Sequence, residues 1–135
     1  MLGVKTYEPA YIDGCRAQLD EQVALFDALP RTAAGDAVDK FSTRFFANLV
    51  IVLDAFFAHR LRTVEGKDGN PLNEVRMLAE SIIGHDGVLA ANKTIKYKPD
   101  SSVLGIAVGD PIRLDRAGFE RLADAYFDAV RAKYT

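Results

Sequence analysis

Hydrophobic residues recur every three or four positions along four stretches of the chain, with charged residues between them. This spacing places the apolar side chains on one face of a helix, so each stretch is predicted to be an amphipathic helix. The four predicted helices run over Pro9–Leu29, from Asp36 or Ala37 to Glu65, over Pro71–Gly84, and from Asp115 towards the end of the chain.

Two of these helices begin with recognisable capping residues. Asn70 precedes Pro71, and this order is typical of an N-cap followed by a proline in the first helical turn. Asp115 is a second N-cap candidate, and Leu114 and Phe119 on either side of it can form a hydrophobic staple. The sequence therefore defines the starts of the third and the last helix.

Between the third and the last helix the pattern changes to an alternation of polar and apolar residues, which is typical of strands. Thr94–Lys98 alternates, and Val103–Val108 and Ile112–Leu114 are two further extended runs. The sequence thus predicts a mainly α fold: a four-helix bundle-like domain with a small β-hairpin or three-strand ribbon before the C-terminal helix. No repeat or linker divides it, so residues 1–135 are expected to form a single helical domain.

Composition narrows the class of protein. About half of the 135 residues are hydrophobic, enough for one core, and the net charge of −2 lacks the basic excess of nucleic-acid or anionic-membrane binders. Cys15 is the only cysteine, which fits a reducing compartment. The most apolar run, Phe45–Ala58, is shorter than the roughly 20 residues of a membrane span, and no signal-peptide pattern precedes it. We therefore expect a cytoplasmic protein that binds neither nucleic acid nor membrane.

The second predicted helix has large apolar side chains around roughly half of its circumference, more than the ~100° stripe that a surface helix needs. Either the other three helices cover this face, or part of it is the seam of a homodimer, because homodimer interfaces are rich in apolar and aromatic residues. We predict a homodimer. The seam would use part of the face formed by Phe45, Phe46, Leu49, Phe56 and Phe57.

The opposite face of the same helix combines small residues with polar ones, among them Asn48, Asp54 and His59. Polar groups need hydrogen-bond partners once they are buried. This face is thus either exposed to solvent, packed closely on a neighbouring helix, or the floor of a polar pocket.

The segment HRLRTVEGKDGNPLNEVR, from His59 to Arg76, concentrates charged and amide side chains between two predicted helices. Its two glycines should let it fold the helices back on each other and gather these side chains at one corner. An anion could dock there at the start of the third helix, aided by the cations. Alternatively, the cations pair with Glu65, Asp68 and Glu74. The candidate ligand-binding residues are Asn48, Asp54, His59, Arg62, Glu65, Lys67, Asp68, Asn70, Asn73 and Arg76.

Catalysis at this corner would depend on His59, because histidine is the side chain that most often acts as a general base. Asp54 or Glu65 could orient it if the fold brings them close. No nucleophile with a neighbouring base is evident, and Cys15 lies on the apolar stripe of the first helix, as a core residue does. An enzyme is thus an alternative in which His59 is the one candidate catalytic residue.

Metal and phosphate motifs are incomplete in this sequence. Two histidines and one cysteine are too few for a zinc site with convergent ligands. The DGN triplet at 68–70 begins like a calcium loop, but the proline that follows breaks the pattern. The GK dipeptide at 66–67 lacks the upstream glycine and the following serine or threonine of a P-loop. We therefore predict no metal and no cofactor.

Three segments, HRLRTVEGKDGNPLNEVR, KTIKYKPDSSVL and GDPIRLDRAGFERL, resemble a group of small, uncharacterised bacterial proteins. The resemblance covers most of the chain and implies a compact one-domain unit. It implies no activity, so function has to be inferred from the residues themselves.

Together these patterns predict a soluble binding or interaction module with a site for a polar or anionic small molecule at the corner between the second and third helices. Two alternatives stay open. One is a small hydrolase-type enzyme that uses His59 as general base, and the other is a purely structural homodimeric partner protein.

Overall fold

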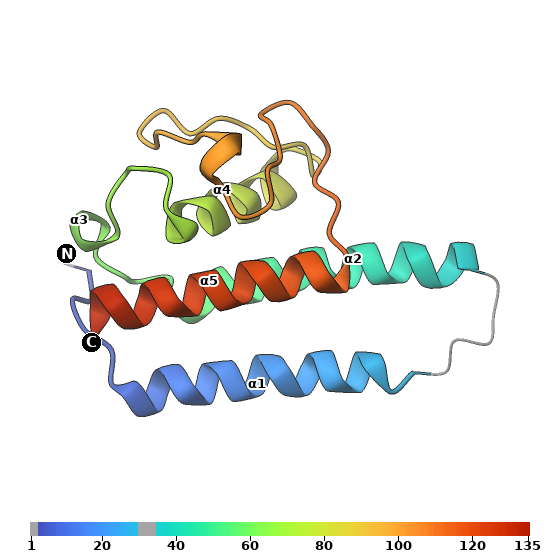
Figure 1. The fold of residues 1–135 in the computed structure, drawn as a ribbon, viewed down its shortest axis with the longest axis horizontal. Coiled ribbons are helices and arrows are strands. Elements are labelled where there is room, and N and C mark those ends of the chain that lie inside the picture. The colour runs from blue at the N-terminus through green and yellow to red at the C-terminus, as the bar shows by residue number, and fades with distance from the viewer. Residues whose placement is uncertain (1–2, 30–34) are drawn as a thin grey trace.

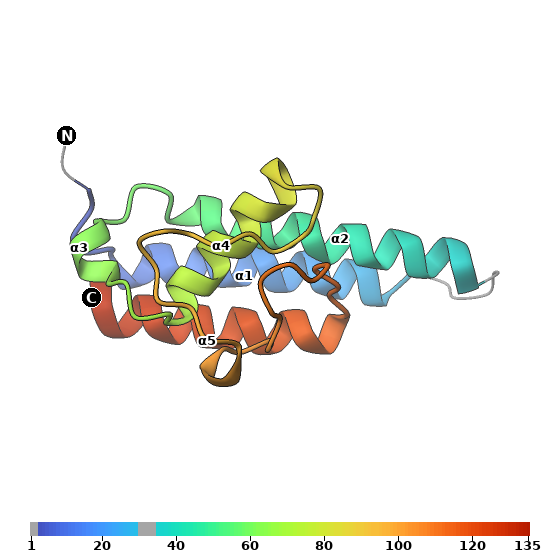
Figure 2. The ribbon, with the colours of Figure 1, turned by 90° about the horizontal axis from the view of Figure 1, so that it is seen from above.

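The computed structural model describes residues 3–29 and 35–135. Three long helices run along the molecule: α1 (Pro9–Asp27), α2 (Gly35–Phe56) and α5 (Arg116–Tyr134). Both α2 and α5 run antiparallel to α1, and the shorter α4 (Pro71–Gly84) packs on α2 and α5 on the side away from α1 (Figures 1 and 2). The short helix α3 (Arg62–Glu65) and a 3-10 turn, η1 (Pro99–Ser101), complete the described helices. The prediction of a mainly helical fold is confirmed, and the arrangement fits a helical bundle.

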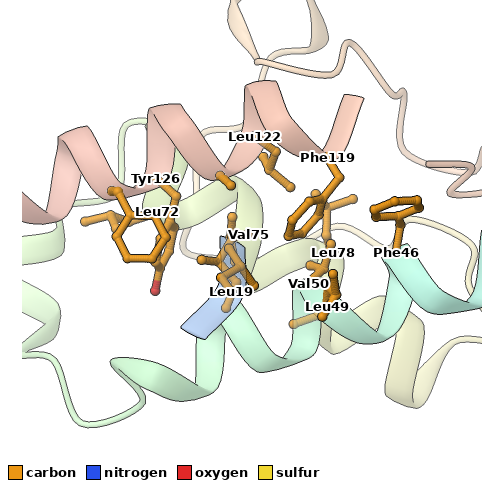
Figure 3. Packing of buried hydrophobic residues seen from close by; sticks show 14 of the residues in the cluster. Leu19, Phe46, Leu49, Val50, Leu72, Val75, Leu78, Phe119, Leu122 and Tyr126 are labelled. Atoms are coloured by element: carbon orange, nitrogen blue, oxygen red, sulfur yellow. The ribbon is translucent and has the colours of Figure 1, made fainter. Parts of the chain in front are cut away.

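The hydrophobic core lies where α1, α2, α4 and α5 meet, and Figure 3 shows side chains from all four helices in contact there. The apolar stripes predicted for the first and last helices are buried, because helical spacing directs them to the same side. These buried residues are Ile12, Cys15, Leu19, Val23 and Phe26 on α1, and Phe119, Leu122, Tyr126 and Val130 on α5. No helix in the described part of the chain is long and apolar enough to cross a membrane.

The predicted capping residues begin their helices as expected. The Asn70 side chain accepts the N–H of Leu72 at 2.9 Å, and Pro71 is the first residue of α4. The Asp115 side chain accepts the N–H of Gly118 at 2.7 Å at the start of α5. Both predicted helix starts are therefore confirmed.

The prediction for the second helix is wrong at its C-terminal end, because α2 ends at Phe56 and not at Glu65. No glycine or proline marks the break, which depends on a contact with the N-terminal segment. The N–H of Val4 donates to the carbonyl of His59 at 2.7 Å, and its carbonyl accepts the N–H of Leu61 at 2.8 Å. In a continuous helix, the carbonyl of His59 and the N–H of Leu61 would form hydrogen bonds within the helix. Their pairing with Val4 therefore excludes a continuous helix.

The predicted β-hairpin or three-strand ribbon is also wrong. Among the described residues, β pairing is confined to two isolated bridges, Val4–Arg60 and Val88–Pro111. The backbone of the long loop before α5 is held by separate contacts instead. The carboxylate of Glu74 accepts the N–H groups of Val103 and Leu104, and the N–H of Lys96 donates to the carbonyl of Lys67. Because these donors are occupied, they cannot form a strand ladder.

Most of the side chains predicted for a dimer seam are packed in the core of the same chain. Phe46, Leu49 and Phe57 are buried in the core, while Phe45 and Phe56 are half-buried. The alternative in which neighbouring helices cover this face of α2 therefore accounts for three of the five side chains.

Candidate functional site

A buried polar cluster lies at the end of the bundle where α3 and both ends of the chain meet (Figure 1). Arg60 is at its centre, in the segment that follows the break after α2. The C-terminal end of α5 closes the cluster from the other side, because the Tyr134 hydroxyl donates to the carbonyl of Leu61 at 2.8 Å. The carbonyl of Tyr134 in turn accepts the N–H of Tyr7 at 2.7 Å. The segment before α1 and the C-terminal end of α5, both distant in sequence, therefore hold the backbone around Arg60.

The guanidinium of Arg60 is completely buried, and all five of its N–H donors have partners. Nε donates to Oε1 of Glu65 at 2.8 Å, and Nη2 donates to Oδ1 of Asp54 at 3.0 Å. Nη1 donates to the hydroxyl of Tyr126 at 3.1 Å. The remaining two donors reach the carbonyl oxygens of Phe57 and Leu72. A buried charge that is paired and fully hydrogen-bonded in this way holds its neighbours in one geometry.

Glu65 is the second buried charge, and it lies between two arginines. Its carboxylate accepts Nε of Arg60 on one side and both Nε and Nη2 of Arg76 on the other. Asn73 donates a further hydrogen bond from Nδ2 at 2.7 Å. Burial by itself raises the pKa of Glu65, but the hydrogen bond from Arg76 and the positive charges of Arg60 and Arg76 outweigh it and hold that pKa below its usual value. Glu65 is therefore ionised at neutral pH.

The loop between α3 and α4 is fixed by side-chain amides. Nδ2 of Asn70 donates to the carbonyl of Glu65 at 2.8 Å and to Oδ1 of Asp68 at 2.7 Å. Oδ1 of Asn73 accepts the N–H of Gly69 at 3.0 Å. Gly69 has φ of +87°, and a Cβ there would lie 2.6 Å from the carbonyl oxygen of Lys96, so only glycine fits. Contacts within the chain therefore hold this loop in a defined shape.

A small cavity of about 30 Å³ opens beside this cluster. Its lining residues are Arg62, Glu65, Gly66, Lys67, Asn73, Arg76, Thr94 and Ile95. Arg62 and Lys67 are exposed, and within the part of the chain that the structure describes neither has an ion-pair partner. Arg76 directs Nε and Nη2 to Glu65, and no described residue accepts a hydrogen bond from its Nη1. Three cationic groups thus border the cavity with donors for which the described residues provide no acceptor.

Most of the predicted ligand-binding residues lie at this corner. Glu65, Asn73 and Arg76 belong to the buried cluster, and Asp54 joins it through Arg60. The residues around them are Arg62 and Lys67 at the cavity and Asp68 and Asn70 in the loop.

His59 and Asn48 do not join the cluster. Both are exposed, neither lines the cavity, and neither side chain forms a hydrogen bond with a described residue. Of the three interpretations of the polar face of the second helix, exposure to solvent therefore applies to these two residues. Asp54 differs from them because its carboxylate is half-buried against Arg60.

Arg60 and Tyr126 belong to the cluster but are not among the residues predicted from the sequence. A signal for Arg60 was present: continued as a helix, the second apolar segment would place Arg60 among the large apolar side chains between Leu49 and Leu53. A charged residue on an apolar face is informative, because burial of its charge requires a partner. Tyr126 fell on the stripe predicted to be core, and nothing in that pattern indicates that its hydroxyl contacts an arginine.

Glu74 is a further buried carboxylate, and it faces the long loop before α5. It accepts the N–H of Val103 at 2.8 Å and of Leu104 at 3.0 Å, and no described cation pairs with it. Burial raises the pKa of Glu74, and the two N–H groups offset this only in part. Of the alternative in which the cations of the corner pair with Glu65, Asp68 and Glu74, the pairing of Glu74 is therefore not found among the described residues, and this carboxylate anchors the loop instead.

Within residues 3–29 and 35–135, no group of three histidine, cysteine, aspartate or glutamate side chains is arranged to hold a metal ion. A comparison of the chain with protein-family models, curated proteins and solved structures found no match in any of the three.

Proposed function

We propose that the protein is a binding module for a small anionic molecule, whose charged group docks at the mouth of the cavity beside Arg76. The observation that carries this proposal is that Arg62, Lys67 and Arg76 line one opening with donors that no described residue accepts, Nη1 of Arg76 among them. Guanidinium and ammonium groups of this kind are the usual protein partners of carboxylates and phosphates.

The balance of charges favours an anion over a neutral ligand. In the buried cluster, the two positive charges of Arg60 and Arg76 are matched by the two negative charges of Glu65 and Asp54. Arg62 and Lys67 then add two unmatched positive charges at the opening. Asp68 is a nearby negative charge, but it does not line the cavity, and its carboxylate accepts a hydrogen bond from Asn70 at 2.7 Å.

The size of the cavity limits how a ligand binds. About 30 Å³ is the space of roughly one water molecule, so the interior does not hold a whole ligand. The charged group would therefore replace solvent at the opening, and the rest of the molecule would lie outside against Thr94 and Ile95. Because the site is shallow, we expect weak binding that decreases with ionic strength.

Titration with inorganic phosphate, followed by amide NMR spectra of the labelled protein, tests the proposal. We expect saturable shifts that are largest at Gly66, Lys67 and Thr94. The double variant Arg62→Gln/Lys67→Gln should weaken the apparent affinity about tenfold or more, since each lost charge-assisted hydrogen bond is worth about 1.5–3 kcal/mol.

The matched control is Arg113→Gln/Arg121→Gln, which removes the same charge from two exposed arginines that lie outside this cavity. It should leave the phosphate affinity nearly unchanged. Shifts that stay linear up to tens of millimolar phosphate, or a loss of affinity that is equal in both double variants, would rule out a specific anion site.

The alternative of an enzyme with His59 as general base gains no support from the geometry. The imidazole has no orienting carboxylate among the described residues and lies outside the cavity. The structural alternative is supported in part, because the fully paired Arg60 cluster needs no ligand. The phosphate titration separates it from the binding proposal, since a purely structural corner would give no saturable shifts.

A further inference from the structure

Two hollows adjoin on the surface where the loop before α5 reaches the start of that helix beside α2 (Figures 1 and 2). Their volumes are about 430 and 330 Å³, and Arg113 of the loop lines both of them. Each volume lies in the range of a ligand site, and the shared arginine joins the two into one elongated surface. We call this surface the arginine groove.

The arginine groove is positively charged. Arg44 of α2, Arg113 of the loop and Arg121 of α5 line it, and all three are exposed. None of the three forms an ion pair with a described residue. The other charged residues of the lining are Lys40, Asp39 and Asp115. Four cations and two carboxylates thus leave a local excess of positive charge, although the chain as a whole has a net charge of −2.

One half of the groove also has apolar lining residues. Leu104 and Ile106 are half-buried there, and Leu114 is buried. Gly118 of α5 lies beside them, because a Cβ at this position would be 3.6 Å from Cδ2 of Leu114 and 3.7 Å from Cδ2 of Leu104. The groove therefore offers contacts to apolar groups as well as to anions.

Contacts within the chain hold the loop side of the groove. The N–H of Leu104 donates to the buried carboxylate of Glu74 at 3.0 Å, and the carbonyl of Ile106 accepts the hydroxyl of Tyr97. A surface that is already held in shape loses less conformational entropy when a partner binds. The carboxylate of Glu74 thus helps to organise this surface.

We infer that the arginine groove binds an extended acidic peptide segment of a partner protein, one that carries apolar side chains as well as carboxylates. Arginines bind carboxylates through paired hydrogen bonds, and those of the groove have no partner among the described residues. Leu104 and Ile106 would contact the apolar side chains of the peptide. Side chains of an extended peptide point alternately to opposite sides, so one segment can satisfy both kinds of contact.

The lining favours a peptide over a nucleic acid. No aromatic side chain among the described residues lines the groove, so bases would have no stacking partner. The net negative charge of the chain also repels a polyanion outside the groove, and it repels a short peptide with few carboxylates less.

The length of the groove favours a peptide over a single small anion. Arg44 lines one hollow and Arg121 lines the other. A small anion in either hollow would leave one of these two arginines without a partner. The groove shares no lining residue with the cavity beside Arg76, so binding here does not depend on the anion site.

Fluorescence anisotropy with the full chain and a labelled eight-residue peptide of alternating glutamate and leucine tests the inference. We expect saturable binding that weakens as the ionic strength rises. Arg44→Gln/Arg113→Gln should weaken it about tenfold or more, since two charge-assisted hydrogen-bonding groups are lost. A peptide with serine in place of leucine should bind several-fold more weakly, and one with glutamine in place of glutamate should not saturate.

The matched control is Arg62→Gln/Lys67→Gln, which removes the same charge at the other cavity. It should change the peptide affinity by less than about twofold, because neither residue lines the groove. Binding that does not saturate at hundreds of micromolar protein, or an equal loss in both double variants, would overturn the inferred groove. A single-stranded oligonucleotide of the same charge that binds as tightly as the peptide would overturn the assignment of a peptide partner.

Discussion

Replacing Glu65 by glutamine should be among the most destabilising single-atom changes in this protein. The substitution keeps the shape of the side chain but removes the charge between Arg60 and Arg76. In the wild-type protein the carboxylate accepts four hydrogen bonds, three from guanidinium groups and one from Asn73. An amide has one acceptor oxygen and an NH₂ group that would face a donor, so at least two of the four bonds are lost.

The magnitude follows from the burial of the partners. Glu65 is 1% exposed and Arg76 is 7% exposed, so solvent does not replace the lost interactions. Removing one member of a buried ion pair typically costs about 3–5 kcal/mol, because the other charge stays buried without compensation. With a urea m-value in the usual range of about 1–3 kcal/mol/M, the unfolding midpoint should fall by roughly 2 M.

Urea denaturation followed by circular dichroism of the helices measures this effect, with Glu8→Gln as the control. Glu8 is exposed and its side chain does not cap α1, so its substitution should change stability by less than about 0.5 kcal/mol. Adding Arg76→Met to Glu65→Gln should cost little more, because it removes the uncompensated charge. A midpoint shift below about 0.5 M for Glu65→Gln would refute the assignment of Glu65 as the ionised centre of the cluster.

Two further predictions concern the same corner. Because the pKa of Glu65 is lower in the folded chain than its usual value of 4.5, its stabilising effect is complete above that value and is lost as the pH falls through the folded pKa. Urea midpoints measured between neutral and strongly acidic pH should therefore fall more steeply in the wild-type protein than in Glu65→Gln, and parallel curves would contradict this. Gly69→Ala should destabilise the protein by more than about 1 kcal/mol, because its φ is positive and its Cβ would lie 2.6 Å from the Lys96 carbonyl. Gly14→Ala, where a Cβ meets no atom within 4 Å, is the control, and equal effects of the two substitutions would contradict the close approach.

The sequence predicts those parts of the fold that depend on residues close together in the chain. The start of α4 depends on Asn70 and Pro71, which are adjacent in the chain, so their pattern is sufficient. The burial of the stripes on α1 and α5 likewise follows from their spacing.

The end of α2 has a non-local cause, and this explains why its prediction was wrong. Residues His59 to Leu61 favour a helix locally, but Val4 occupies their backbone groups from a segment more than fifty residues away. The absent β-hairpin has a similar explanation, because the side chain of Glu74 takes two N–H groups that strand pairing would need. Neither contact leaves a signal in the spacing of hydrophobic residues.

The sequence predicted most of the residues of the candidate site but not how they are arranged. The composition of the segment HRLRTVEGKDGNPLNEVR predicted that Glu65, Asn73 and Arg76 lie close together. Hydrogen bonds from Asn73 and Arg76 to Glu65 confirm this. His59, the one candidate catalytic residue of the sequence, lies outside the cluster with an exposed side chain, while the neighbouring Arg60 is buried. His59 and Arg60 are adjacent in the sequence, and the direction of each side chain depends on the break after α2.

The closure of the corner by Val4, Tyr7 and Tyr134 has a consequence for how the protein is made. These contacts hold the backbone at His59 to Leu61, and the last of them forms only after residue 134 has been synthesised. While the ribosome is still producing α5, the residues of α1, α2 and α4 have already been synthesised, but Arg60 lacks the hydroxyl of Tyr126. The charged corner should therefore be the last region to become native during translation, although its own residues are made at mid-chain.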